Sequence, residues 1–255
     1  MLRGCPVLLQ HSRGCGNIPK GYVEVMDEDT AALLDILRTS RRPSLRLEAV
    51  RQLAASQAPE SIPALLEVLD DADNPRSVAV VTAAIAALQE LGEVAGPYIL
   101  ATLDEQDGKR RQFMPLLLAS SLGREAVPRL LGALQDGDVE VAVNAATQLG
   151  QLRVVEAFEP LLDVARDTRA PAALRGAAAS SLGALRDRRA LPILVEMLSA
   201  PERDLLAGAI DGLADLRDPA GAPYLEVLLE RPDLDEATER AIRLGLLAME
   251  RYRSR

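Results

Sequence analysis

The residues of this 255-residue chain best suited to metal binding or catalysis lie at its N-terminus. Cys5 and Cys15 are its only cysteines, and His11 is its only histidine. Three soft ligands without a fourth make a poor structural zinc site, so we predict no metal and no cofactor. A disulfide is not expected in a chain that we predict to be cytoplasmic. Residues 16–255 lack the parts of a Ser-His-Asp triad or a Cys-His dyad, and we predict no catalytic residues.

Composition narrows the possible partners. The chain has 29 basic and 38 acidic residues and a net charge of -9, which argues against a nucleic-acid-binding surface. No uninterrupted apolar run approaches the roughly 20 residues of a membrane span, so we predict no membrane contact. Hydrophobic residues make up 48% of the chain but aromatic residues only 2%, which favours helices packed through Ala, Leu and Val.

Residues 1–25 differ from the rest of the chain. They contain four Gly and two Pro and show no helical period. The apolar patch from Pro6 to Leu9 is shorter than the core of a signal peptide. We interpret residues 1–25 as an irregular leader that the native protein could lack, with Met26 as the natural start. A docked N-terminal arm is the alternative, and the intact mass of the native protein would distinguish the two.

From residue 26 onward, proline recurs at intervals of 34, 31, 32, 32 and 31 residues. Because proline is tolerated in the first helical turn, each marks the start of a helix, here called helix A. An apolar residue follows two positions later in every case. The prolines are Pro63, Pro97, Pro128, Pro160, Pro192 and Pro223.

An Ala-rich second helix, here called helix B, precedes each of these prolines. We expect it to end at Leu53, Leu91, Leu122, Leu149, Leu182 or Leu213 in successive repeats. Leu91 and Leu122 lie only six residues before the next proline, which predicts shorter connections there. Gly follows Leu91, Leu122, Leu149 and Leu182, as expected for left-handed helix caps. Pro115 should kink or divide the third helix B.

Stacked units of about 32 residues predict a solenoid, because one helical pair cannot bury its apolar face alone. The A-A-x-x-L-G elements and the Leu185-Arg186-Asp187 connection resemble HEAT-like repeats, most of all the short bacterial type first associated with phycobilisome lyases. The resemblance implies an all-α, right-handed α/α superhelical solenoid of about seven helical hairpins, forming one domain over residues 26–255. The Arg typical of helix B in this family appears at Arg46 and Arg175, so its ladder of Asp–Arg pairs is expected to be incomplete.

In the HEAT-like arrangement, B helices line the concave surface. Counting back two, five and nine residues from the final Leu of each helix B gives the expected groove floor. Phe113 and Leu117 form its one large apolar pair and either make a binding hot spot or pack into the core. The predicted partner-binding residues are Arg51, Gln89, Phe113, Leu117, Glu140, Asn144, Thr147, Asp204 and Asp211.

The leading functional hypothesis is a non-enzymatic scaffold that binds another protein along the concave helix-B surface. The family resemblance implies an alternative, a bilin lyase subunit that would use Arg51, Glu140, Asp204 and Asp211. The chain lacks the repeated His-Glu pairs of a HEAT-like di-iron hydroxylase and the basic groove of a HEAT-like DNA glycosylase. A small basic edge at Arg186, Arg188, Arg189 and Arg217 is interpreted as a solvated loop or, at most, a contact for an acidic partner.

Overall fold

The computed structural model of the protein describes residues 28–105 and 108–253, so the predicted leader lies outside the described residues. The described part contains fourteen α-helices and no β-strand. Successive helices pair into seven hairpins, as predicted. The pairs are α1 (Glu28–Thr39) with α2 (Pro43–Ser56), α3 (Ile62–Val68) with α4 (Val78–Glu90), α5 (Gly96–Leu103) with α6 (Met114–Leu122), α7 (Val127–Ala133) with α8 (Val139–Gln151), α9 (Phe158–Arg166) with α10 (Ala172–Ala184), α11 (Leu191–Met197) with α12 (Arg203–Leu216), and α13 (Ala222–Leu229) with α14 (Glu236–Arg253).

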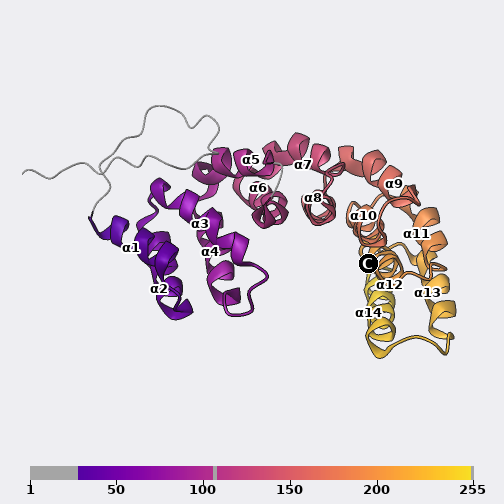
Figure 1. Cartoon of the computed structure of the whole chain (residues 1–255). Coiled ribbons are helices and arrows are strands. Elements are labelled where there is room, and N and C mark those ends of the chain that lie inside the picture. Colours follow the sequence, from indigo (N-terminus) through magenta and orange to yellow (C-terminus); the bar gives the residue numbers. More distant parts are fainter. Residues whose placement is uncertain (1–27, 106–107, 254–255) are drawn as a thin grey trace, which may run out of the picture.

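The hairpins stack into an arch (Figure 1). The A helices, with odd numbers, follow its outer side, and the B helices, with even numbers, follow its inner side. One continuous hydrophobic core runs between the two layers. The all-α solenoid predicted from the repeats is therefore confirmed.

Five of the six prolines begin A helices as predicted, whereas Pro160 is the third residue of α9 and Leu162 after it is only partly buried. Pro63, Pro97, Pro128, Pro192 and Pro223 occupy the first or second position of α3, α5, α7, α11 and α13, where the missing amide hydrogen has no helical acceptor. The apolar residues two positions later are fully buried in these five helices. They are Leu65, Ile99, Leu130, Leu194 and Leu225.

The structure corrects the register of two B helices. Leu88 in α4 and Leu118 in α6 occupy the core position, nine and ten residues before the next proline. Leu91 and Leu122 follow these core residues in the sequence. They lie where the backbone passes from α4 or α6 into a 3₁₀ helix that begins at Gly92 or Gly123, respectively. The α4–α5 connection has five residues and the α6–α7 connection has four, against five or six elsewhere, so the predicted shortening is at most two residues. The Leu-Gly pairs mark the ends of these helices, where Leu91 is still buried in the core and Leu122 is only partly buried against it.

Pro115 lies in the first turn of α6, which starts only at Met114. The residues before it, Lys109–Phe113, form a 3₁₀ helix. Because proline cannot donate a backbone hydrogen bond, it is compatible with this first turn but not with a helix that continues upstream. The third helix B is divided at this point, as predicted.

Glycines let α8, α10 and α12 approach closely. A methyl group added at Gly183 would overlap the backbone of Gly212, and one at Gly208 would overlap the backbone of Gly176. A Cβ at Gly150 would lie 2.7 Å from the Ser181 hydroxyl oxygen. Gly150 and Gly183 are thus packing residues inside helices, not the left-handed caps expected from the sequence. Gly92 and Gly123 do have a positive φ.

Candidate partner-binding groove

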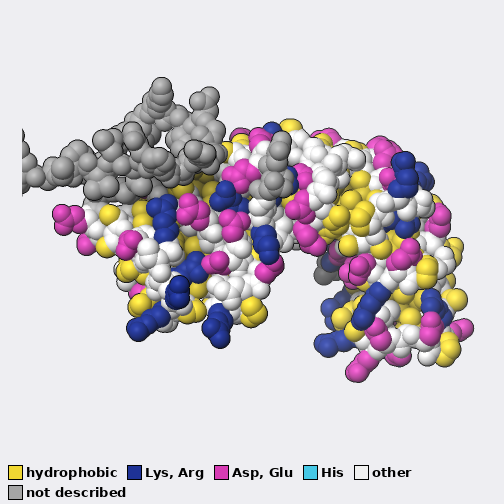
Figure 2. All heavy atoms as spheres, viewed as in Figure 1, with side chains coloured by type: hydrophobic (Ala, Val, Ile, Leu, Met, Phe, Trp, Pro, Cys, Tyr) yellow, Lys and Arg dark blue, Asp and Glu magenta, His cyan; other side chains and the backbone are white. Residues whose placement is uncertain are grey.

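A depression of about 490 Å³ lies on the inner side of α8, α10 and α12. Its floor is shallow because the glycine contacts draw the three helices together and the floor side chains are small. The two arms of the arch leave an open hollow in front of it (Figure 2). The lining residues are Thr147, Gly150, Gln151, Ala173, Gly176, Ala177, Ser180, Ser181, Ala184, Asp204, Ala207, Gly208, Asp211 and Asp215.

Three carboxylates from α12 give the depression its charge. Asp204, Asp211 and Asp215 line it, and its lining contains no Lys or Arg among the described residues. Partial burial, together with the negative charge of Asp215, raises the pKa of Asp211 above its ordinary value. Ionisation of Asp211 therefore costs more free energy than ionisation of an exposed aspartate, and a cation from a partner would lower this cost.

Three of the predicted partner-binding residues, Thr147, Asp204 and Asp211, line this depression. Arg51, Gln89 and Glu140 are exposed on α2, α4 and α8 and do not line it. The residues suggested for a bilin thus divide between the two arms of the arch, with Arg51 on α2 and the two aspartates on α12 (Figure 1).

The predicted binding hot spot of Phe113 and Leu117 is wrong for Leu117. Leu117 is 0% exposed and belongs to the core, so no partner can reach its side chain. Phe113 is half-buried and packs against the same core. The Asn144 amide donates to the Gln112 carbonyl oxygen at 2.8 Å and ties α8 to the segment before α6. The error follows from counting back from Leu122 instead of Leu118.

Gly176, Ala207 and Asp215 line the groove but were missed by the sequence pattern. Gly176 and Ala207 each lie six residues before the core Leu of their helix, and Asp215 lies two residues after it. The pattern of minus two, minus five and minus nine sampled too narrow a stripe. A wider stripe that included minus six would have found Gly176 and Ala207.

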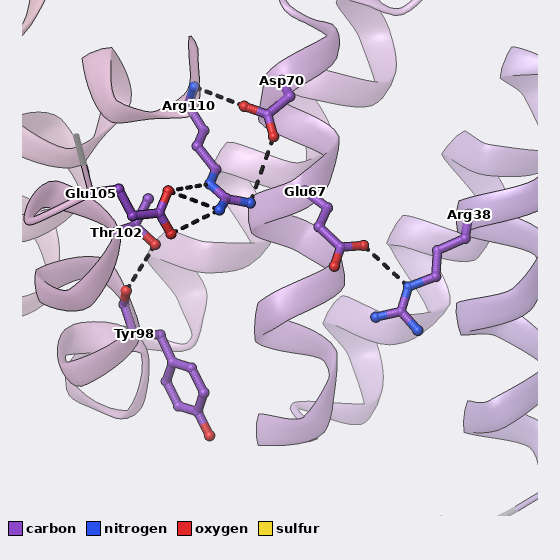
Figure 3. Close-up of polar contacts among 7 residues, drawn as sticks. All are labelled: Arg38, Glu67, Asp70, Tyr98, Thr102, Glu105 and Arg110. Atoms are coloured by element: carbon purple, nitrogen blue, oxygen red, sulfur yellow. Dashed lines mark hydrogen bonds and ion pairs between the residues drawn. The ribbon is translucent and has the colours of Figure 1, made fainter. Parts of the chain in front are cut away.

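Ion pairs connect neighbouring hairpins away from the groove. Arg110 makes two hydrogen bonds of 2.8 Å to the Glu105 carboxylate and lies 3.6 Å from Asp70, and Arg38 pairs with Glu67 at 3.1 Å (Figure 3). Partial burial lowers the pKa of Arg110, but the bond to Glu105 outweighs this and the pKa is raised overall. These residues hold α1, α3 and the turn after α5 in register.

The described residues contain no cluster of His, Cys, Asp and Glu suited to a metal ion. Cys5, His11 and Cys15, for which we predicted no metal site, lie outside the described residues. No single described helix is long and apolar enough to cross a membrane. Val78–Glu90 and Gly92–Leu103 reach that length only together, with a bend of 109° between them.

The family model for HEAT repeats matches residues 30–114 and 167–244, which together make up more than half of the chain. The chain belongs to the HEAT-repeat family. Comparison with proteins of established description found no match.

Several solved repeat structures are similar to this HEAT-repeat chain. The CpcE–CpcF complex of phycocyanin lyase from Nostoc sp. PCC7120 is 24% identical, with a TM-score of 0.39 over 73% of this chain and 98% of that chain. An engineered protein is 18% identical, with a TM-score of 0.45 over 87% and 68%. A designed armadillo repeat protein in complex with the peptide (KR)4 is 18% identical, with a TM-score of 0.41 over 88% and 100%.

The arginine ladder of this HEAT-repeat chain has one more member than predicted. Arg46, Arg111 and Arg175 each donate to a carbonyl oxygen at the end of the A helix in their own hairpin, namely Leu37, Leu103 and Ala165. Each also pairs with an acid of the next hairpin, namely Asp71, Asp136 and Glu202 at 2.6, 2.7 and 3.8 Å. Arg111 lies seven residues before Leu118, so the corrected register reveals it. The ladder occupies alternate hairpins.

Proposed function

We propose that this chain is a protein-interaction scaffold whose groove on α8, α10 and α12 binds a basic segment of a partner protein. The observation that supports this most directly is the groove itself, an open depression with a small-residue floor and three carboxylates on one wall. Small floor residues allow a helix or an extended chain to approach closely. The carboxylates favour a partner that carries Lys or Arg.

The electrostatics of Asp211 support a basic ligand. Its raised pKa reflects partial burial and the like charge of Asp215, which lies four residues later on the same helix face. A Lys or Arg placed between these carboxylates would remove that repulsion and form charge-assisted hydrogen bonds. Binding of a basic segment is therefore expected to weaken with increasing salt concentration.

Filling the groove tests this proposal. Ala207→Trp would place a large side chain on the groove wall at an exposed position, and Ala101→Trp would make the same change on α5, on the outer side. Both variants and the wild type would be used to capture partners from the native organism. We expect the Ala207→Trp variant to lose proteins that the other two retain.

A second experiment addresses the charge. Asp204→Asn, Asp211→Asn and Asp215→Asn would be combined in one variant, with Glu226→Gln, Glu230→Gln and Glu236→Gln as a charge-matched control. We expect the groove variant to release its partner at lower salt than the control does. Retention of the same proteins by both the filled and the neutralised groove would refute the proposed site.

A further inference from the structure

A left-handed residue follows the B helix in six successive hairpins. Its φ lies between 50° and 58° in each case. The residues at this position are Gln57, Gly92, Gly123, Arg153, Arg186 and Arg217. Three consecutive hairpins of the C-terminal half thus place an arginine where glycine is the residue with the least steric strain.

We call Arg153, Arg186 and Arg217 the arginine edge. Only their backbones take part in hydrogen bonds within the described residues. Their backbone amides donate to the carbonyl oxygens of Gly150, Gly183 and Leu213, which completes the helix caps. Within the described residues, none of their side chains makes a hydrogen bond or an ion pair. A cation at a helix C-terminus interacts favourably with the helix dipole, but glycine would remove the strain of the left-handed backbone.

A pocket of about 380 Å³ with both apolar and charged lining residues lies beside Arg186 of the arginine edge. It is lined by Val155, Phe158 and Leu185 and bounded by Arg186, Asp187 and Arg188. Val155 is 64% exposed and is one of several large apolar side chains that the described part of the chain leaves accessible. The pocket therefore offers an apolar surface next to Arg186, a cation without a partner in the described part of the chain.

Ion pairs hold the surroundings of this pocket in place. Arg189 lies 4.0 Å from the centre of the Phe158 ring and pairs with Glu159 at 2.8 Å. Arg188 pairs with the buried Asp218 at 2.5 Å. These contacts tie the connection that carries Arg186 to α9 and to the connection that carries Arg217, and the three arginines occupy equivalent positions in consecutive hairpins.

We propose that the arginine edge and the pocket at Val155 bind an acidic segment of a partner protein that carries one apolar side chain. The apolar side chain would enter the pocket, and neighbouring carboxylates would accept bidentate hydrogen bonds from Arg186 and its counterparts. This site is separate from the groove on α8, α10 and α12 and takes a ligand of opposite charge. It does not depend on the function proposed for the groove.

The probe is a short fluorescein-labelled peptide with one Leu between runs of Glu and Ser, and binding is measured by fluorescence anisotropy. The variant Arg153→Gly, Arg186→Gly and Arg217→Gly removes the cations but suits the left-handed backbone. We expect it to bind the probe about tenfold or more weakly, with a Tm that is not below the wild-type value. Val155→Ser should also weaken binding, whereas Ala207→Trp in the groove should not.

The control is Arg41→Gln, Arg76→Gln and Arg124→Gln, which changes the net charge equally at exposed positions elsewhere. It should bind the probe as the wild type does. The proposal is overturned if the wild type does not bind, if test and control variants weaken binding equally, or if the probe with Ser in place of Leu binds as tightly. It is also overturned if the wild type self-associates through this edge and the glycine variant does not, because a second copy would then occupy the site.

Discussion

Arg46, Arg111 and Arg175 join each hairpin to the next through a carbonyl oxygen and a carboxylate. Arg111 is the most buried of these contacts, and both of its acceptors lie in the protein interior or at its margin. Removing a buried charged donor leaves its acceptors without their hydrogen bonds. The ladder should therefore contribute more to stability than the more numerous surface pairs.

Arg111→Ala should lower the free energy of unfolding by about 2–4 kcal/mol, because the Leu103 carbonyl oxygen and Asp136 lose their shared donor. Arg129→Ala removes the ion pair with Asp104, in which both side chains are exposed. This variant should change the free energy of unfolding by less than about 0.5 kcal/mol. Urea denaturation of both variants measures the difference. Equal effects would show that Arg111 is not a ladder residue.

Asp218 makes stability depend on pH. Burial raises its pKa, but the Ala220 amide and Arg188 outweigh this, so the pKa is lowered overall. An ionised Asp218 thus stabilises the folded state above its unfolded pKa of about 4, and this contribution is lost as the pH falls through the folded pKa. Asp218→Asn should cost about 1–2 kcal/mol at pH 7 and progressively less below about pH 4.

Thermal unfolding between pH 3 and pH 7 would show this convergence of the wild type and Asp218→Asn. The matched control is Asp233→Asn, which removes an exposed pair with Arg231 and should have a smaller effect at pH 7. A constant difference between wild type and Asp218→Asn across this pH range would contradict the assignment.

At the scale of the helices, glycine positions decide how closely the B helices stack. Gly183 in α10 faces the backbone of Gly212 in α12 with no space for a methyl group. A methyl group added at Gly132 in α7 would meet no heavy atom of the described residues within 4 Å, apart from those of its own helix turn. The same substitution therefore has opposite consequences at the two sites.

Gly183→Ala should destabilise the protein by about 3 kcal/mol, because two helix backbones must separate. Gly132→Ala should stabilise it by about 0.5–1 kcal/mol, because alanine loses less backbone entropy on folding. Differential scanning calorimetry of the two variants compares them directly. A Gly183→Ala variant as stable as the wild type would show that α10 and α12 do not touch through this seam.

Helix starts were predictable because proline has a local steric effect that does not depend on the partner helix. The core positions of α4 and α6 were not, because Leu88, Leu91, Leu118 and Leu122 are all apolar and lie near the end of a helix. Only the neighbouring hairpins decide which Leu turns inward. Because of this ambiguity, the sequence pattern placed Leu117 in the groove and did not identify Arg111 as a member of the arginine ladder.

At the scale of the whole molecule, the arch separates two surfaces of different charge. The groove inside the arch presents Asp204, Asp211 and Asp215, whereas the arginine edge presents cations at the ends of the B helices. A scaffold with both surfaces could hold a basic segment and an acidic segment at once. The two proposed experiments test these surfaces independently, since each uses variants that leave the other intact.

The spacing of prolines and leucines predicted about seven stacked hairpins, because helix initiation and apolar periodicity act over a few residues. The resemblance to HEAT-like repeats predicted the inner row of B helices. The tertiary structure decided which small residues meet across α8, α10 and α12, where the groove lies, and which arginines take a left-handed backbone. These features depend on distances between residues about 30 positions apart, and such distances are set only when the hairpins pack.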